Sequence, residues 1–266
     1  MLEIKNIWKT FRPTPNPEDE KKALQGVSLT IHDDDFITVI GSNGSGKTTL
    51  LNIIAGALFP DEGQIILDGK NITKMSSVKR AAFIGRVFQD PRLGTIADIS
   101  LFENLSIASR RGGKQSPIRW ALTKKKREEF AALLAPLGLG LEKRLDAPMG
   151  AFSGGQRQSV TLLMASLNDP KLLLLDEHTA ALDPKTAKTV MALTETIVNE
   201  SHTPTLMITH NMKDAIQYGN RLIMMADGKI IFDASGEEKK KLTVSALLEK
   251  FQSASEEALP DSAILQ

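Results

Sequence analysis

The residue types best suited to chemistry form a phosphate-binding loop. It consists of Gly41, Ser42, Asn43, Gly44, Ser45, Gly46, Lys47 and Thr48. The glycines let backbone N–H groups turn inward around phosphate oxygens, and the expected following helix, which includes Thr49, presents its positive end to the anion. Lys47 can reach the β- and γ-phosphates, and Thr48 offers a hydroxyl to Mg²⁺. The loop predicts nucleotide binding, but kinases, GTPases and motors share it.

A second candidate is the pair of carboxylates that ends an apolar run. Leu172–Leu175 is followed directly by Asp176 and Glu177. Such a run suits a strand buried on both faces, and the carboxyl ends of these strands face the ligand crevice. We expect Asp176 to hold the Mg²⁺ shell and Glu177 to orient the attacking water. A strand that merely ends in a polar turn would look the same, but its order after the phosphate loop favours catalysis.

A second glycine motif lies just before the acidic strand. It is made of Ser153, Gly154, Gly155 and Gln156, preceded by Phe152. A helix is expected over Arg157–Leu167, so Ser153 can cap its start and the two glycines allow an anion to approach the backbone. The motif therefore predicts a second anion-binding helix start, although one chain offers no obvious second phosphate for it.

The elements that must position these residues alternate between strands and helices. Strands are expected at Leu2–Trp8, Ala23–Ile31, Phe36–Ile40, Gln64–Leu67, Leu172–Leu175, Thr205–Thr209 and Arg221–Met225. From Pro91 to about Leu145 the helical period replaces strand alternation, which indicates an inserted helical subdomain. The alternation predicts an α/β fold with a mostly parallel sheet.

Composition narrows the function classes. The 266 residues carry a formal net charge of +1, which disfavours a nucleic-acid binder. There is no cysteine, so disulfides, thiolate catalysis and cysteine-bound zinc are excluded. Met1–Lys5 alternates apolar and polar residues, and no apolar run is long enough to span a membrane, so we expect neither a signal peptide nor a span.

With its three motifs in this order, the sequence resembles the nucleotide-binding subunits of ABC transporters. The family's signature motif is Leu-Ser-Gly-Gly-Gln, and Phe152 stands here in place of the leucine. In the family this motif contacts the γ-phosphate held by the opposite subunit. The resemblance therefore implies a homodimer with two Mg·ATP at its interface, in which Ser153 and Gly155 face the phosphate.

The resemblance extends over almost the whole chain. It implies that Gln89 touches Mg²⁺ and the water, that Asp183 contacts the partner subunit, and that His210 contacts the γ-phosphate. Phe11 lies where the family stacks an aromatic ring on adenine, which suits its flat face. Trp8 competes for that role, although core packing is favoured for Trp8, and core packing is nearly as good an interpretation for Phe11.

The fold implied by the resemblance is a P-loop NTPase core with an N-terminal antiparallel β-subdomain and an inserted α-helical subdomain. Residues 1–252 would form a single ATPase domain. Within it, 1–90 and 165–252 would make the β-subdomain and the RecA-like core, and 91–164 the helical subdomain with the signature motif. Residues 253–266 are expected to form a C-terminal tail.

The resemblance also implies a role: the ATP-hydrolysing motor of a transporter, docked at the cytoplasmic face of the membrane on a separate permease. The wider sequence looks like a bacterial importer branch linked to amino acids, aromatic ones included, and fed by an extracellular solute-binding protein. Two alternatives stay open: a soluble ABC-type ATPase acting on nucleic acid or ribosomes, and a module that holds ATP without hydrolysing it. Glu177, Gln89 and His210 disfavour the last.

One residue departs from the family pattern. His178 follows Glu177 at a position where many members have proline. A histidine there adds a titratable group near the water site. We interpret it as a local turn residue.

Overall fold

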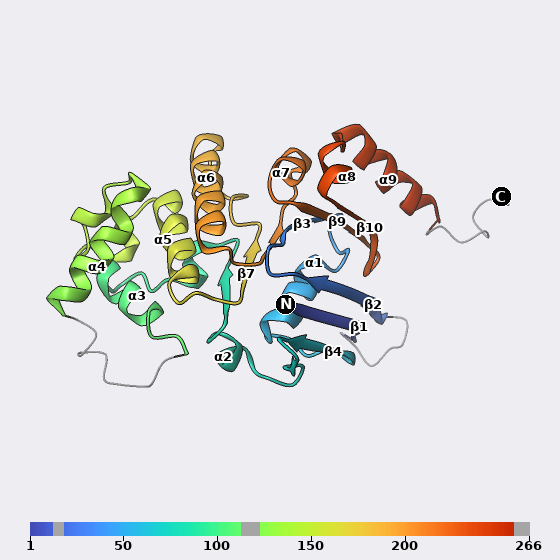
Figure 1. Ribbon diagram of the computed structural model, residues 1–266, viewed down its shortest axis with the longest axis horizontal. Helices are drawn as coiled ribbons and strands as arrows, with labels where there is room; N and C mark the ends of the chain where they lie inside the picture. The colour runs from blue at the N-terminus through green and yellow to red at the C-terminus, as the bar shows by residue number, and fades with distance from the viewer. Residues whose placement is uncertain (13–18, 113–122, 258–266) are drawn as a thin grey trace. The chain divides into compact units, whose positions relative to one another are not determined.

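The structure is a computed structural model that describes residues 1–12, 19–112 and 123–257 (Figure 1). It divides into two compact units. The first combines Met1–Ser76 with Leu206–Gln266, and the second is Ser77–Thr205. Each unit is described by itself.

An antiparallel sheet in the first unit confirms the expected N-terminal β-subdomain. Its strands are β1 (Leu2–Phe11), β2 (Lys21–Ile31), β4 (Glu62–Leu67) and β5 (Lys70–Asn71), in the order β2-β1-β4-β5. Strand β1 pairs with both β2 and β4, so that Leu2 lies opposite Ile31 on one side and Leu67 on the other. Apolar side chains at alternate positions, among them Leu2 and Ile4, are buried and hold the sheet to the rest of the unit.

The phosphate loop follows a buried strand of the same unit. That strand, β3 (Phe36–Gly41), pairs in parallel with β9 (Arg221–Ala226), and β10 (Lys229–Ser235) continues the sheet antiparallel to β9. On its other side β3 neighbours β8 (Thr205–Ile208). The helices of this unit are α1 (Lys47–Ala55), α7 (Met212–Gln217), α8 (Gly236–Lys240) and α9 (Val244–Glu257). Leu247 of α9 packs into a core with Ile40, Leu222 and Met224.

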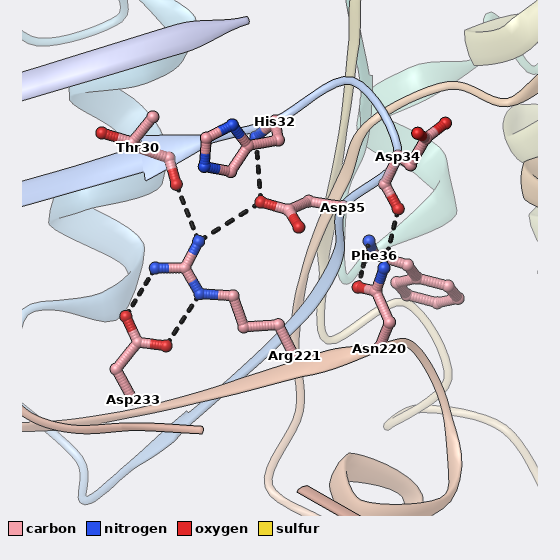
Figure 2. Close-up of polar contacts among 8 residues, drawn as sticks. All are labelled: Thr30, His32, Asp34, Asp35, Phe36, Asn220, Arg221 and Asp233. Atoms are coloured by element: carbon pink, nitrogen blue, oxygen red, sulfur yellow. Dashed lines mark hydrogen bonds and ion pairs between the residues drawn. The ribbon is translucent and has the colours of Figure 1, made fainter. Parts of the chain in front are cut away.

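A network of polar contacts secures the start of β3 (Figure 2). The guanidinium of Arg221 donates two hydrogen bonds to Asp233, of 2.7 and 2.5 Å, one of 2.8 Å to the carbonyl of Thr30 and one of 3.2 Å to Asp35. Beside it, the Asn220 side chain accepts from the N–H of Phe36 at 2.9 Å. Bidentate, charge-assisted bonds of this kind fix geometry as well as contributing energy. The strand that leads into the phosphate loop is thus anchored at its first residue.

The second unit combines two parallel strands with most of the helices. Strands β6 (Ile84–Val87) and β7 (Leu172–Asp176) pair in register, so that Val87 lies opposite Leu175. The helices are α2 (Ser77–Arg80), α3 (Leu101–Ala108), α4 (Lys124–Leu134), α5 (Gly154–Ser166) and α6 (Pro184–Ser201), with short 3₁₀ turns at Pro91–Gly94, Ala135–Leu137, Leu141–Lys143 and Met149–Ala151. These parallel strands and helices bear out the expected α/β class.

The helical part has its own core and its own start signals. Leu101, Leu105, Phe130, Leu134 and Leu163 are among its buried residues, and the rings of Phe102 and Phe130 meet edge to face at 5.9 Å. Helix α3 begins with a capping box between Ser100 and Glu103. In α4 two basic side chains pair with acids on the surface, Lys126 with Glu129 and Arg127 with Asp146.

The boundaries differ from the expected ones in two places. The compact unit Ser77–Thr205 is larger than the helical subdomain expected at 91–164, because β6 pairs with β7 and α5 packs on α6. The tail expected from residue 253 begins as helix, since α9 continues to Glu257; its remainder lies outside the described residues. No helix within the described ranges is long and apolar enough to cross a membrane.

Candidate nucleotide-binding site

The phosphate loop of the first unit is shaped by glycine positions that tolerate no side chain. Gly46, the N-cap of α1, has φ +100°, and a Cβ there would lie 2.5 Å from the carbonyl oxygen of Ala23. Gly44 is also left-handed, with φ +83°, but a Cβ there would make no contact closer than ordinary van der Waals distance. A Cβ at Gly41 would lie 2.4 Å from the carbonyl oxygen of Met225. The loop is therefore a cradle that only glycine backbone can form.

Lys47 is folded into this cradle. Its Nζ donates hydrogen bonds to the carbonyl oxygens of Gly41, at 2.8 Å, and Ser42, at 2.9 Å, and the side chain is buried. Thr48 is exposed at the start of α1, and the first turn of that helix contains no acidic residue. The helix end therefore offers positive potential that no carboxylate of its own neutralises.

His210 belongs to the same unit and follows a strand that neighbours β3. The N–H of Thr209, directly after β8, donates to the carbonyl of Val39 at 3.1 Å. The next residue, His210, is exposed, and Asn211 caps α7 by accepting from the N–H groups of Lys213 and Asp214. His210 and the phosphate loop thus both lie at the carboxyl ends of adjacent strands, where ligands bind in such sheets.

The aromatic residues of β1 are placed differently from one another. Phe11 ends the strand and is 37% exposed, with the Nζ of Lys9 5.8 Å from its ring centroid. Trp8 is also 37% exposed, so the core packing favoured for it is wrong. Its indole N–H bonds Asn6 at 3.0 Å, and its ring lies close to Gly26, where an added Cβ would be 3.2 Å from Cζ2 of Trp8. Phe11 stays the better candidate for adenine stacking.

The acidic strand end of the second unit is buried and paired. Leu172–Leu175 and Asp176 are all buried, as expected of a strand covered on both faces. Asp176 forms an ion pair with Arg86 of β6, Nη2 to Oδ2 at 3.3 Å. Arg86 also stacks 4.5 Å from the ring centroid of Phe88. Desolvation of this arginine lowers its pKa, and the charge of Asp176 opposes that effect.

Gln89 is positioned by the pairing of the two strands. It lies two residues beyond Val87, which is opposite Leu175, so β6 and β7 deliver Gln89 and the two carboxylates to the same sheet edge. Gln89 itself is exposed. The preceding carbonyl, that of Phe88, accepts a 3.1 Å hydrogen bond from the buried side chain of Gln158 in α5. Helix α5 therefore fixes the backbone directly before Gln89.

Glu177 and His178 form the turn after β7. Glu177 has φ +47°, a left-handed conformation that is uncommon for a residue with a side chain. His178 is buried, with its Nε2 2.9 Å from the hydroxyl of Thr194 on α6. Burial lowers the pKa of His178 to about 4, because desolvation disfavours the charged ring. His178 is thus the turn residue expected, and it is also a buried contact to a helix.

The signature motif begins α5 as expected. Ser153 caps the helix and forms a capping box with Gln156, through bonds of 3.3 and 3.1 Å. Ser153 and Gly154 are exposed, but Gly155 is buried. A Cβ at Gly155 would lie 2.0 Å from Cγ2 of Thr186, so glycine is required there for the packing of α5 on α6. The sequence interpretation assigned this glycine to anion contact alone, which is incomplete.

Asp183 caps a helix, in addition to the contact with the partner subunit that is expected of it. Its carboxylate caps α6 by accepting from the N–H groups of Lys185, at 3.2 Å, and Thr186, at 3.1 Å. Hydrogen bonds from Thr186 lower the pKa of Asp183. Pro184 follows at the first helical position, where its missing N–H costs nothing.

The donor chemistry fits ATP and Mg²⁺. The glycine cradle and the α1 N-terminus suit phosphate oxygens, and a Cβ added at Gly44 would meet only the Nζ of Lys21, at 3.5 Å. Each unit also carries oxygen donors of the kind that Mg²⁺ prefers: the hydroxyl of Thr48 in the first, and the amide of Gln89 and the carboxylate of Asp176 in the second.

Four side chains with a place near these motifs were missed by sequence reasoning. Arg86 had a signal, because it is the one charged residue in the strand Ile84–Val87. Lys21, which starts β2 and lies beside the loop, had none. Gln158 and Thr194 are ordinary helix residues whose buried contacts appear only in the fold.

Comparison with known proteins agrees with this geometry. The ABC transporter family profile matches residues 24–180. The tyrosine transport ATP-binding protein of Clostridioides difficile (strain R20291) is 48% identical over 255 residues, which are 96% of this chain and all of that protein. The phosphonates import ATP-binding protein PhnC of Treponema denticola is 33% identical over 242 residues, 88% of this chain and 89% of that protein.

A solved ATP-binding cassette, crystallised as a dimer in a post-hydrolysis state with ADP and Pi, superimposes with a TM-score of 0.73 at 28% identity, over 88% of this chain and 98% of that one. The family profile covers more than half of the chain, and the 48% identical relative is matched over its whole length. The chain therefore belongs to the ABC transporter family, as an ATP-binding subunit whose ATPase activity drives transport.

Proposed function

We propose that this chain is the motor of an importer for a small solute, an amino acid, with tyrosine or a related aromatic amino acid as the one transported. The observation that carries the proposal is its identity of 48% to the tyrosine transport ATP-binding protein over that protein's whole length, against 33% to the phosphonate importer subunit. The proposed solute is therefore taken from the name of the more similar of these two relatives.

ATP-binding subunits of this family bind ATP, form dimers and work with membrane permease subunits. For this chain we propose a homodimer around two Mg·ATP, on the cytoplasmic face of the membrane, with a permease and an extracellular solute-binding protein as partners. The region 91–164 would transmit motion to the permease as the dimer closes and reopens. Ser153, Gly154, Gly155 and Gln156 of one copy, with Asp183, would face the nucleotide of the other.

The chemistry proposed for each residue follows from its place. The phosphate loop, from Gly41 to Thr48 and with Thr49 behind it, would bind the phosphates, with Lys47 exchanging its loop carbonyls for phosphate oxygens. Mg²⁺, when bound through Thr48, Gln89 and Asp176, supplies neutralisation of phosphate charge. Phe11 would stack on adenine.

The water that attacks the γ-phosphate would be oriented by Glu177, and His210 would contact the γ-phosphate itself. Closure of the dimer would exclude other water and complete the geometry. Loss of the γ-phosphate removes the charge that attracts the start of α5, so the dimer would reopen. Hydrolysis is thereby coupled to motion.

The first test replaces the proposed water-orienting carboxylate. We expect Glu177→Gln to retain ATP binding, to lower kcat by about 10²–10⁴-fold, as loss of a positioned general base does, and to trap a dimer when ATP is added. Steady-state ATP hydrolysis and the mass in solution by light scattering measure both effects. Glu195→Gln, an exposed carboxylate of α6, is the matched control and should behave as wild type. Normal turnover by Glu177→Gln would refute the assignment.

The role in import is tested on the assembled system. The tagged chain is captured from detergent-solubilised membranes of its own host, and the complex is reconstituted in vesicles with external tyrosine, phenylalanine or methylphosphonate. ATP-dependent uptake of the aromatic amino acids supports the proposal. Uptake of the phosphonate, or capture of ribosomal or nucleic-acid partners without a permease, would overturn the solute or the transport role while leaving the ATPase chemistry intact.

A further inference from the structure

His178 makes a contact that a turn residue does not need. Its ring is 2% exposed, in a turn that begins with the exceptional backbone of Glu177. The contact reaches sixteen residues along the chain, to the hydroxyl of Thr194 on α6, whose side chain is itself fully buried. A buried polar pair of this kind fixes the position of both groups, because breaking it leaves a polar atom without water.

The direction of the hydrogen bond follows from the second contact of Thr194. The hydroxyl lies 2.8 Å from the carbonyl oxygen of Val190, one turn earlier in α6, and a carbonyl can only accept. The single hydroxyl proton is therefore donated to Val190, and Oγ1 accepts from the ring of His178. The ring carries its proton on Nε2.

His178 directly follows Glu177, the residue proposed to orient the attacking water. Glu177 has φ +47°, and holding a residue with a Cβ in that region costs on the order of 1–2 kcal/mol. Without a contact that holds it, the turn would relax toward a less strained backbone conformation. His178 does so from the adjacent position, through a helix that starts at the Asp183 cap. The turn between β7 and α6 is thus secured at both ends by side chains.

We propose that His178 is the positioning residue for Glu177: its Nε2–H, bonded to Thr194, holds the strained turn so that the Glu177 carboxylate is aimed at the attacking water. This inference rests on the proposed role of Glu177 and adds the device that positions it. A shift of about 1 Å in such a group can lower turnover about 100-fold without affecting substrate binding. His178 itself touches no substrate.

The test separates positioning from packing by restoring the donor. His178→Leu fills the space without a donor, and His178→Gln places an amide N–H at a similar reach. In the full-length chain we expect His178→Leu to lower kcat for ATP hydrolysis about 100-fold with KM for ATP changed less than about 3-fold. His178→Gln should recover at least a tenth of the wild-type kcat.

The partner residue offers a matched pair of controls. Thr194→Val removes the acceptor and should lower kcat as His178→Leu does, and Thr194→Ser should preserve it. Thr196→Val removes an exposed threonine of the same helix whose hydroxyl bonds the Ala192 carbonyl at 3.0 Å, and it should change nothing. The double variant His178→Leu/Thr194→Val should be no slower than either single one, because both break one hydrogen bond.

Three results would overturn the inference. They are a normal kcat in His178→Leu, a kcat that tracks thermal stability across the series with no recovery in His178→Gln, and losses that multiply in the double variant. Failure of the underlying function is seen separately, since Glu177→Gln would then hydrolyse ATP normally. An inactive Glu177→Gln together with a fully active His178→Leu would refute only the positioning role.

Discussion

The phosphate loop of the first unit and the acidic strand end of the second are built by different means. The loop is made of backbone: Gly41 and Gly46 lie so close to neighbouring carbonyls that no Cβ fits. The Nζ of Lys47 donates to two carbonyls and one hydroxyl of the loop itself, those of Gly41, Ser42 and Ser45. The strand end is made of side-chain contacts, from Arg86 to Asp176 and from His178 to Thr194. A site made of backbone requires particular residue types at neighbouring positions, so it can be recognised in the local sequence. A site held by side-chain contacts depends on residues that are distant in the sequence.

The largest effect is expected when one methyl group is added to the phosphate loop, because this tests whether the loop depends on bare backbone. Gly46→Ala places a Cβ 2.5 Å from the Ala23 carbonyl at φ +100°, so we expect ATP affinity to fall more than about 100-fold and stability to fall by about 3 kcal/mol or more, as strain and collision add. Binding of a fluorescent ATP analogue and urea unfolding measure these.

Gly44→Ala is its control, because that position is equally left-handed but a Cβ there would make no contact closer than ordinary van der Waals distance. Strain alone predicts a loss of about 1–2 kcal/mol. Equal damage by the two variants would mean that conformation, and not close approach, shapes the loop.

The second prediction removes an anchor from the strand end. Arg86→Met keeps the length of the side chain but leaves Asp176 without this ion pair, and we expect a loss of about 2–4 kcal/mol in the free energy of unfolding because the carboxylate is buried. Urea unfolding without nucleotide measures it. Arg86→Met/Asp176→Asn should recover part of that loss, since the uncompensated charge is gone. A double variant that is no more stable than Arg86→Met would show that the ion pair does not anchor this strand end.

The smallest expected effect concerns Gly155, which belongs to the signature motif and also lies where α5 packs on α6. Gly155→Ala puts a Cβ 2.0 Å from Cγ2 of Thr186, and we expect a loss of about 1–3 kcal/mol, the usual range for overpacking. Thr186→Ser removes that methyl group and keeps the hydroxyl, so Gly155→Ala/Thr186→Ser should regain most of the stability in thermal unfolding. A double variant as unstable as Gly155→Ala would assign this glycine to something other than helix packing.

Much of the architecture was predictable from local patterns. The parallel strands and the inserted helices follow from alternation and periodicity, and the ends of β3 and β7 were placed to within a residue. The antiparallel β-subdomain was implied by the family resemblance. The errors have physical causes. Trp8 looked like a core residue because it is large and apolar, but it lies on the surface, where its ring packs close to Gly26 and its indole N–H bonds Asn6. Residues Ser77–Thr205 form one compact unit because β6 pairs with β7, which lies far along the chain.

By itself, the sequence determined the residue types of the phosphate loop, the apolar strand that ends in two carboxylates and the serine that caps α5, because each depends on neighbours within a few positions. Only the tertiary structure decided which side chain pairs with Asp176, what packs against Gly155 and what His178 contacts. Those answers depend on contacts from Arg86, Thr186 and Thr194, which lie far away in the chain or on another element. A buried side chain is matched to its partner through space, and no spacing in the sequence records that match.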